Sequence, residues 1–279
     1  MATRRRAKTE KDYLEVARRV VHRPTDVDDF WKLLAYSRNK KGKTTFGMSA
    51  GIERTLIVDP EHGTDKFKRL NPYVWPITRW EDMQDAWGAI RTMKLSPAVL
   101  GQGSSEEPFT WISVDGTTKL NNMALRYIGK VQEERDLDRR PGIIDRRDYN
   151  KSGELMKDMV NNFLNLRMNV VFTAQERMMV ADYGDNEEDE ETTYFVPDLP
   201  NGVRGALNSV VDCIGRLYVV RVDVKGEEKN QRRMQIGVHE RYDTGFRSDY
   251  GEDLPAMIRY PTIPKLTRLL ATGSVKNRK

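Results

Sequence analysis

A glycine, a lysine and two threonines stand together in a short basic segment, with the spacing of a phosphate-binding turn. Residues 37–45 are Ser-Arg-Asn-Lys-Lys-Gly-Lys-Thr-Thr. They fit G-x-x-x-x-G-K-[ST] except that Ser37 replaces the first glycine and must adopt its turn. In such a turn backbone N–H groups surround the phosphates, a lysine reaches the β and γ phosphates, and a hydroxyl binds Mg²⁺. A basic surface turn is the alternative. The residues expected to bind the nucleotide, ATP, are Ser37, Arg38, Asn39, Lys40, Lys41, Gly42, Lys43, Thr44 and Thr45.

A carboxylate follows the next apolar segment. Residues 55–58 are Thr-Leu-Ile-Val, and Asp59 and Glu61 come shortly after them. If this segment and residues 31–36 are neighbouring strands of a parallel sheet, their ends share one edge, and Glu61 faces the phosphate bound by Lys43. A carboxylate there can orient and deprotonate an attacking water. The alternative is that the two acids only cap the end of a strand.

Two further apolar segments end in polar side chains. Residues 109–114 precede Asp115, the pattern of a Walker B strand, whose carboxylate holds Mg²⁺ directly or through water. We therefore predict that Thr44 and Asp115 bind the metal. The strand that ends at residue 173 precedes Gln175, whose amide can hydrogen-bond the γ-phosphate and lose that contact on hydrolysis. An ordinary polar strand end is the alternative in both cases.

A sheet must bring these side chains together, and the apolar segments predict one. Helical patterns at 80–93, 119–134 and 153–166 alternate with strand candidates, which is typical of a parallel, doubly wound α/β sheet. The last strand candidates follow one another without helices and predict an antiparallel extension at the C-terminal edge. Strands are expected at 31–36, 55–58, 73–77, 109–114, 169–173, 216–224 and 234–239, and a helix at 44–50.

Composition restricts the class of protein. The chain has 279 residues, 38% of them hydrophobic, enough for one large core. We expect a basic N-terminal tail or helix at 1–29, one domain at 30–270 and a basic C-terminal tail at 271–279. The formal net charge of +5 suits a polyanionic partner. Cys213 is the single cysteine, and the sequence has no apolar run of about 18 residues, so we expect a cytoplasmic protein without a membrane partner.

Together these segments resemble the RecA-type recombinases and, more closely, the RecA-like single-strand annealing ATPases of bacteriophages, over residues 30–270. The resemblance rests on residues 42–45, 57–62, 113–115 and 172–175. It implies a RecA-like P-loop core that binds ATP and Mg²⁺, with Glu61 as the catalytic base and Gln175 as the nucleotide sensor. It also implies a homo-oligomer, ring or filament, in a bacterial host cell, with a single-strand-binding protein as a further partner.

The resemblance extends to a residue that acts between subunits. The phage ATPases tend to carry a Lys-x-Arg-like element after the penultimate strands, and the corresponding residues 241–248 lack the lysine but keep Arg247. RecA-like ATPases commonly bind ATP at subunit interfaces, where a basic residue of the next protomer offsets charge on the transferred phosphoryl group. We therefore expect Arg247 to act in trans, with Arg241 in reserve.

A basic segment at 133–151 is expected to be a mobile loop, and it sits where RecA-type proteins place a DNA-binding loop. The acidic segment 182–191 occupies another such place, where its carboxylates would repel phosphates. The favoured function is a DNA-dependent ATPase that binds single-stranded DNA and promotes annealing or strand exchange in homologous recombination. A replicative helicase or helicase loader, or a protein whose assembly ATP controls, are the alternatives. The residues expected to contact DNA are Arg135, Arg139, Arg140, Arg146, Arg147 and Lys151.

Overall fold

The computed structural model describes residues 9–21, 23, 29–136, 138–181, 192–224 and 226–275. It has two units, Met1–Phe30 and Trp31–Lys279. In the first unit, helix α1 (Glu10–Val20) begins after Thr9, whose hydroxyl accepts the backbone N–H of Asp12 while the Asp12 carboxylate accepts that of Thr9. This reciprocal cap satisfies two backbone donors at the start of the helix.

A ten-stranded sheet forms the centre of the second unit, in the order β10-β8-β7-β1-β5-β4-β2-β3, with β6 beside β5 and β9 beside β7. The strands from β7 to β3 in this order run parallel, and β8 and β10 continue the sheet in antiparallel fashion. The predicted α/β class, a mostly parallel sheet with an antiparallel C-terminal extension, is confirmed. The strands are β1 (Lys32–Ser37), β2 (Thr55–Asp59), β3 (Tyr73–Pro76), β4 (Trp111–Asp115), β5 (Asn169–Ala181), β6 (Thr192–Pro197), β7 (Cys213–Val224), β8 (Glu227–Gln235), β9 (Gly245–Phe246) and β10 (Met257–Arg259).

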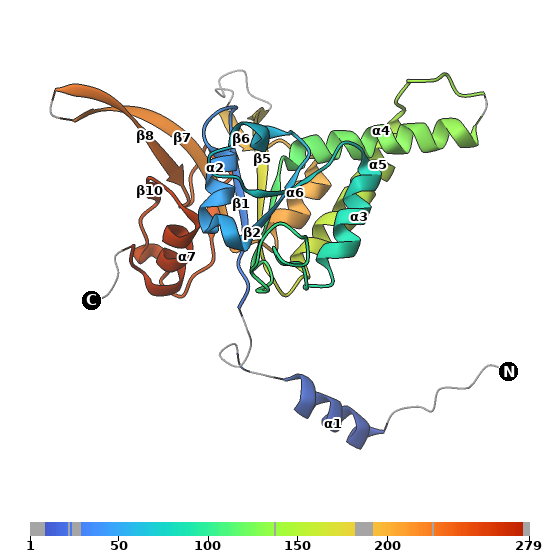
Figure 1. Ribbon diagram of the computed structural model, residues 1–279, viewed down its shortest axis with the longest axis horizontal. Coiled ribbons are helices and arrows are strands. Elements are labelled where there is room, and N and C mark those ends of the chain that lie inside the picture. The colour runs from blue at the N-terminus through green and yellow to red at the C-terminus, as the bar shows by residue number, and fades with distance from the viewer. Residues whose placement is uncertain are drawn as a thin grey trace, which may run out of the picture. The chain divides into compact units, whose positions relative to one another are not determined.

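Helices cover both faces of the sheet (Figure 1). One face carries α3 (Trp80–Ile90), α4 (Thr117–Arg135), α5 (Arg146–Leu164) and α6 (Asn201–Asn208), and the other carries α2 (Lys43–Gly47) and α7 (Ile263–Thr272). Because successive strand residues point to opposite faces, Leu34 and Tyr36 of β1 enter the first core while Leu33 and Ala35 enter the second. Among the described helices, none combines the length and the apolar composition that crossing a membrane requires.

Several elements differ from the sequence prediction. Strand β5 continues to Ala181, past the predicted end at 173, because residues 176–181 pair with β6 outside the parallel sheet. Strands β6 and β10 and helices α6 and α7 have no predicted counterpart, and α7 extends the folded unit to Thr272. Helix α6 has only eight residues, which is too short for its periodicity to stand out in the sequence.

The segment 133–151, expected to be a loop, is helical at both ends. Helix α4 continues to Arg135 and α5 begins at Arg146, so that residues 136–145 alone connect them. The missed signal is Asp148, whose carboxylate accepts the backbone N–H of Asp145 at 2.8 Å and thereby caps the start of α5. The prediction of a loop over the whole segment was therefore wrong.

Arg139 lies inside this connection and contacts Asp148, which is fully buried. Both terminal nitrogens of the Arg139 guanidinium donate to the two carboxylate oxygens of Asp148, and only 10% of the Arg139 side chain is exposed. Hydrogen bonds from Arg139 hold the pKa of the Asp148 carboxyl below its ordinary value. Arg139 is thus engaged within the chain, whereas the neighbouring Arg140 is exposed.

The contact predicts a difference in stability between two adjacent arginines. Arg139→Ala should lower the free energy of unfolding by about 3 kcal/mol, because it leaves a buried carboxylate without its partner. Arg140→Ala should change it by less than about 0.5 kcal/mol. Urea unfolding followed by circular dichroism compares both variants with the unaltered chain. Equal stability of all three would show that Asp148 does not depend on Arg139.

Candidate active site

The phosphate-binding turn lies between the end of β1 and the start of α2. Ser37 does not take the turn expected of the missing glycine. It is the fully buried last residue of β1, and its hydroxyl donates to the carbonyl of Arg38 at 2.8 Å. The left-handed backbone lies further along, at Lys40 (φ 60°) and Gly42 (φ 101°). Serine is therefore accommodated at position 37 without backbone strain.

Lys43 opens α2 and is buried. Its ammonium group donates to the side-chain carbonyl of Gln175 at 3.0 Å and to the backbone carbonyl of Ser37 at 3.3 Å. Burial lowers the pKa of Lys43, and the nearby carboxylates of Glu61 and Asp115 oppose that shift. The fold thus brings together a lysine and a glutamine that are far apart in the sequence.

The loop after β2 brings Glu61 to the same place. Asp59 ends β2, and its carboxylate accepts the backbone N–H groups of Glu61 at 3.0 Å and Thr64 at 2.9 Å, so that it supports the loop. Glu61 accepts a hydrogen bond from the side-chain amide of Gln175 at 3.2 Å. Gly116 borders Glu61, and a Cβ at that position would lie 2.7 Å from Cγ of Glu61. Only glycine leaves room for the carboxylate there.

The position of Glu61 has a different cause from the one predicted. Strands β1 and β2 are not neighbours, because β5 and β4 lie between them. Glu61 still reaches Gln175 because the ends of all four parallel strands lie at one edge of the sheet. Strand β5 lies between β1, which leads into the turn, and β4, which ends in Asp115, so that the turn and this acid stand at the same edge of the sheet.

Two oxygen donors suited to Mg²⁺ lie beside the turn. The carboxylate of Asp115 accepts the hydroxyl of Thr173 at 2.6 Å. Burial raises the pKa of Asp115, and hydrogen bonds from Thr173 and Thr44 oppose this shift. Within the described ranges no three acidic, histidine or cysteine side chains form a metal cluster. Thr44 and Asp115 fit Mg²⁺, which commonly takes one or two protein ligands and completes its shell with phosphate and water.

The phosphate-binding turn lines a cavity of about 460 Å³, a volume typical of ligand pockets. Thr44 is among its lining residues and Asp115 is not. Glu61 and Gln175 line it together with two residues that the sequence did not indicate, Phe67 and Arg232 of β8. From the predicted nucleotide-binding segment, the cavity is lined by Asn39, Lys40, Gly42, Lys43, Thr44 and Thr45; Ser37, Arg38 and Lys41 are not among the lining residues.

Arg232 lies against Gly42. A Cβ added to Gly42 would come within 2.5 Å of Nε of Arg232. That Nε is buried and has no hydrogen-bond partner among the described residues. In the sequence Arg232 is one of several basic residues of β8, and only the antiparallel pairing of β8 with β7 brings it to the turn. No local signal distinguishes it from Arg233.

Arg247 lies near the amino-terminal ends of the parallel strands, whereas the cavity lies at their carboxyl-terminal ends. It follows β9, which pairs with the first two residues of β7, and β7 runs parallel to β1. Its terminal nitrogens donate to the backbone carbonyls of Ser209 and Val210 at the end of α6. Arg241 is exposed. Arg247 is therefore remote from the cavity of its own chain, and the trans role expected for it requires a second copy.

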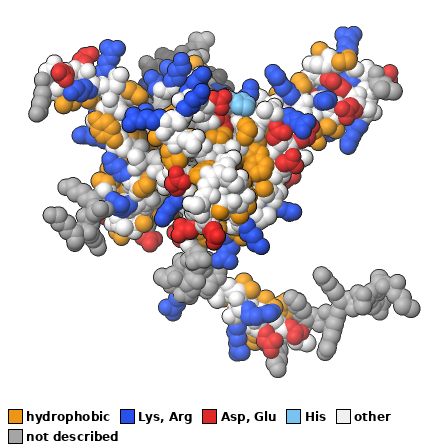
Figure 2. Space-filling model, in the orientation of Figure 1, with side chains coloured by type: hydrophobic (Ala, Val, Ile, Leu, Met, Phe, Trp, Pro, Cys, Tyr) orange, Lys and Arg blue, Asp and Glu red, His pale blue; other side chains and the backbone are white. Residues whose placement is uncertain are grey.

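The residues predicted to contact DNA gather where α4 ends and α5 begins. We call this region the basic tip. The tip is separated from Asp115 by the 19 residues of α4, about 28 Å. Basic side chains project from this end of the molecule (Figure 2). The acidic segment 182–191 and the basic residues 1–8 lie outside the described residues. The exposed members of the tip are Arg135, Arg140, Arg146, Arg147 and Lys151.

Comparison with known proteins gives a family for most of the chain. A family model described as an AAA domain matches residues 29–248. No curated protein matches the chain. Among solved structures, the chain is similar to the crystal structure of the flagellar accessory protein FlaH from Methanocaldococcus jannaschii. The identity is 11%, the TM-score is 0.33, and the match covers 73% of this chain and 77% of that one.

Proposed function

The chain belongs to this AAA-domain family of P-loop ATPases, and we propose that it is a Mg²⁺-dependent ATPase whose hydrolysis is coupled to single-stranded DNA. One observation carries the ATPase proposal, namely the row of hydrogen bonds that joins Lys43, Gln175 and Glu61 along one cavity. It places a cation, an amide and a carboxylate side by side. Phosphoryl transfer to water requires charge compensation and a group that orients the attacking water.

Each of these side chains has a role that its contacts support. Lys43 exchanges the carbonyl of Gln175 for a phosphate oxygen when the turn binds ATP. Gln175 can then turn its amide nitrogen from Glu61 to the γ-phosphate and lose that contact after hydrolysis. Glu61, held over Gly116, orients a water and accepts its proton. Thr44 and Asp115 would hold Mg²⁺, which would supply positive charge to offset the charge of the phosphates.

The role of Glu61 can be tested with a change of one group. Glu61→Gln should lower the rate of hydrolysis by about 10²–10⁴-fold while ATP affinity is retained, because an amide keeps the shape of the side chain but cannot accept the proton. Asp65 is an exposed acid of the same loop, and Asp65→Asn serves as the matched control. Phosphate release and calorimetric ATP binding measure the two effects. Hydrolysis by Glu61→Gln at the parental rate would remove Glu61 from the mechanism.

Two arginines are candidates for offsetting charge on the transferred phosphoryl group. Arg232 lines the cavity of its own chain and presents a buried Nε that has no partner among the described residues. Arg247 acts only on a neighbouring chain, in a ring or filament of identical subunits. The contact of Arg232 with Gly42 favours Arg232 acting in cis, and Arg247 in trans is the alternative.

Mixing of variants separates these two proposals. Arg232→Ala and Glu61→Gln chains should stay inactive when mixed, because each variant damages its own site. Arg247→Ala mixed with Glu61→Gln should recover hydrolysis only if Arg247 acts in trans. Arg233 lies beside Arg232 on the same strand and donates to the side chain of Gln231 at 2.8 Å, so Arg233→Ala is the control. Full activity of Arg232→Ala alone, or recovery in its mixture with Glu61→Gln, would exclude the cis role.

We also propose that the basic tip binds the phosphates of single-stranded DNA, and that annealing or strand exchange in recombination is the resulting activity. The continuity of α4 between the tip and the active site supports this coupling. Near the start of α4, the hydroxyl of Thr118 accepts the backbone N–H of Gln175 at 3.0 Å and donates to the carbonyl of Asp198 at 2.9 Å. A shift of α4 on DNA binding therefore reaches the proposed sensor.

If DNA binds at the basic tip, the affinity for DNA should depend less on salt concentration once the charges of the tip are removed. Replacing Arg140, Arg146 and Arg147 with alanine should reduce the slope of log affinity against log salt by about 2, at about 0.7 per phosphate contact on a single strand. Fluorescence anisotropy with labelled oligothymidylate measures the slope. Arg91 and Lys94 are exposed at the far end of α3, and their joint replacement is the control. An unchanged slope in the triple variant would show that DNA does not contact the tip.

A further inference from the structure

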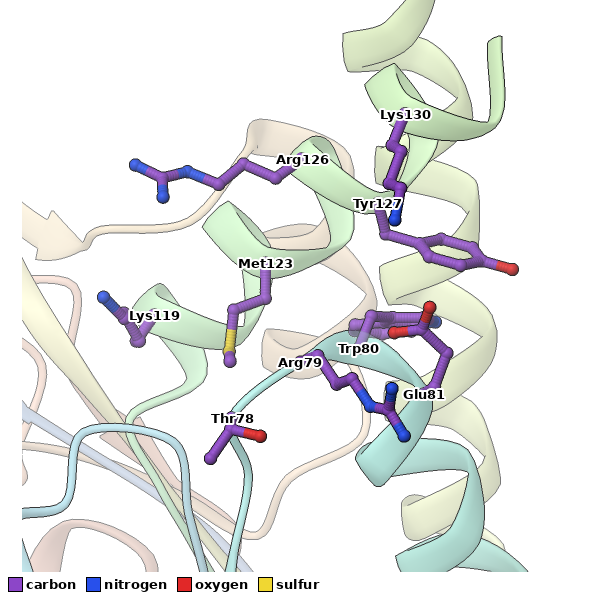
Figure 3. A pocket seen from close by; sticks show the side chains of 9 residues that line it. All are labelled: Thr78, Arg79, Trp80, Glu81, Lys119, Met123, Arg126, Tyr127 and Lys130. Atoms are coloured by element: carbon purple, nitrogen blue, oxygen red, sulfur yellow. The ribbon is translucent and has the colours of Figure 1, made fainter. Parts of the chain in front are cut away.

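A groove of about 320 Å³ lies between α4 and the start of α3 (Figure 3). We call it the α4 groove. Figure 3 shows the side chains of one wall projecting from α4 and those of the other wall lying where the chain enters α3. The α4 wall includes Lys119, Met123, Arg126, Tyr127 and Lys130, and the opposite wall is formed by residues 78–81.

The groove is strongly basic. Four of its lining residues are cations, and Glu81 is the one carboxylate that lines it. Arg79 forms an ion pair with Asp82 at 3.0 Å. The three cations of α4 that line the groove, Lys119, Arg126 and Lys130, are exposed and form no ion pair in the part of the chain that the structure describes.

The spacing of these cations places their charges along one face of α4. Positions 119, 126 and 130 lie on the same side of a helix, and like charges four residues apart, as at 126 and 130, repel each other. This arrangement destabilises an isolated helix, and an anion lying along the groove would reverse the effect. Charge complementarity therefore indicates an extended polyanion as the occupant.

Two further cavities adjoin the groove and share lining residues with it. Thr78, Lys119 and Met123 also line a cavity of about 490 Å³ that includes Glu61 and Gln175. The groove shares Lys119, Met123 and Arg126 with another cavity, of about 250 Å³, that reaches Ile144 in the connection between α4 and α5. Together the three cavities reach from Gln175 to the connection that carries the basic tip.

The groove also offers groups that can bind bases. Tyr127 is half-buried and provides an aromatic ring on which a base can stack, which is a common device in proteins that bind single strands. Trp80 is only 3% exposed, and its buried indole N–H has no hydrogen-bond partner among the described residues. A single strand, unlike a duplex, has bases free for such contacts.

We propose that the α4 groove is the path of a single strand of DNA between the basic tip and the active site. This inference rests on the proposed DNA-coupled function but assigns it residues outside the segment 133–151. From Lys119 to Lys130 the helix rises about 16 Å, the length of about five phosphates at the spacing of a stacked strand. The groove places bound DNA against the same helix whose first turn holds Gln175.

The test uses the full chain and labelled oligothymidylate. The double variant Arg126→Ala/Lys130→Ala should reduce the slope of log affinity against log salt by about 1.4 and abolish stimulation of ATP hydrolysis by DNA, with hydrolysis without DNA unchanged. Tyr127→Leu should lower affinity by about 5-fold to 150-fold, whereas Tyr127→Phe, which keeps the ring, should not. The Arg91→Ala/Lys94→Ala variant removes the same charge elsewhere and should bind normally.

The outcomes separate this inference from the function on which it rests. Normal DNA binding by the groove variants, alongside weakened binding by the tip variant, would overturn the groove as a DNA path and leave the proposed function intact. No DNA binding by the unaltered chain would overturn both. If the groove variants altered the sedimentation of the protein but not its affinity for DNA, the groove would bind a protein segment, and the proposal would be wrong.

Discussion

The register of β5 between β1 and β4 is the constraint on which the active site depends. Thr173 lies opposite Asp115, and Gln175 lies opposite Ser37. Because these two residues of β5 are two positions apart, their side chains point to the same face of the sheet. The hydroxyl of Thr173 donates to Asp115, the proposed metal ligand. The side chain of Gln175 contacts both Lys43 and Glu61. A slip of one residue would turn both side chains to the other face.

The next residue of β5, Glu176, connects the turn to β7. Glu176 is almost completely buried and forms ion pairs with Arg38 at 3.1 Å and with Arg216 of β7 at 2.5 Å. Arg216 also lies over the ring of Tyr242, 4.1 Å from its centroid. A buried carboxylate needs such partners to offset the cost of its desolvation. The C-terminal strands are thus part of the active-site structure, since β7 supplies Arg216 to Glu176 and β8 supplies Arg232 to the turn.

Local residue patterns predicted the fold class and the residues at the strand ends, because a buried strand or a turn can be recognised from a few consecutive residues. The order of the strands in the sheet could not be predicted in this way. Glu61 was expected at the correct edge of the sheet, but as a neighbour of β1, because order depends on crossovers between distant segments. Arg232 was missed since only the pairing of β8 with β7 brings it to Gly42. Arg139 and Arg140 look alike in the sequence, and their different surroundings depend on Asp148 at the start of α5.

The length of β5 has a mechanical consequence. Its 13 residues extend about 43 Å, and Gln175 stands at the point where the strand leaves β1 and enters its pairing with β6. Gln175 is therefore the point about which the second half of β5 could rotate. A small rotation of the backbone there would displace Ala181 by a larger distance, and the pairing of β5 with β6 could be kept. If Gln175 senses the bound nucleotide as proposed, a change there would be carried along β5 to the residues that pair with β6.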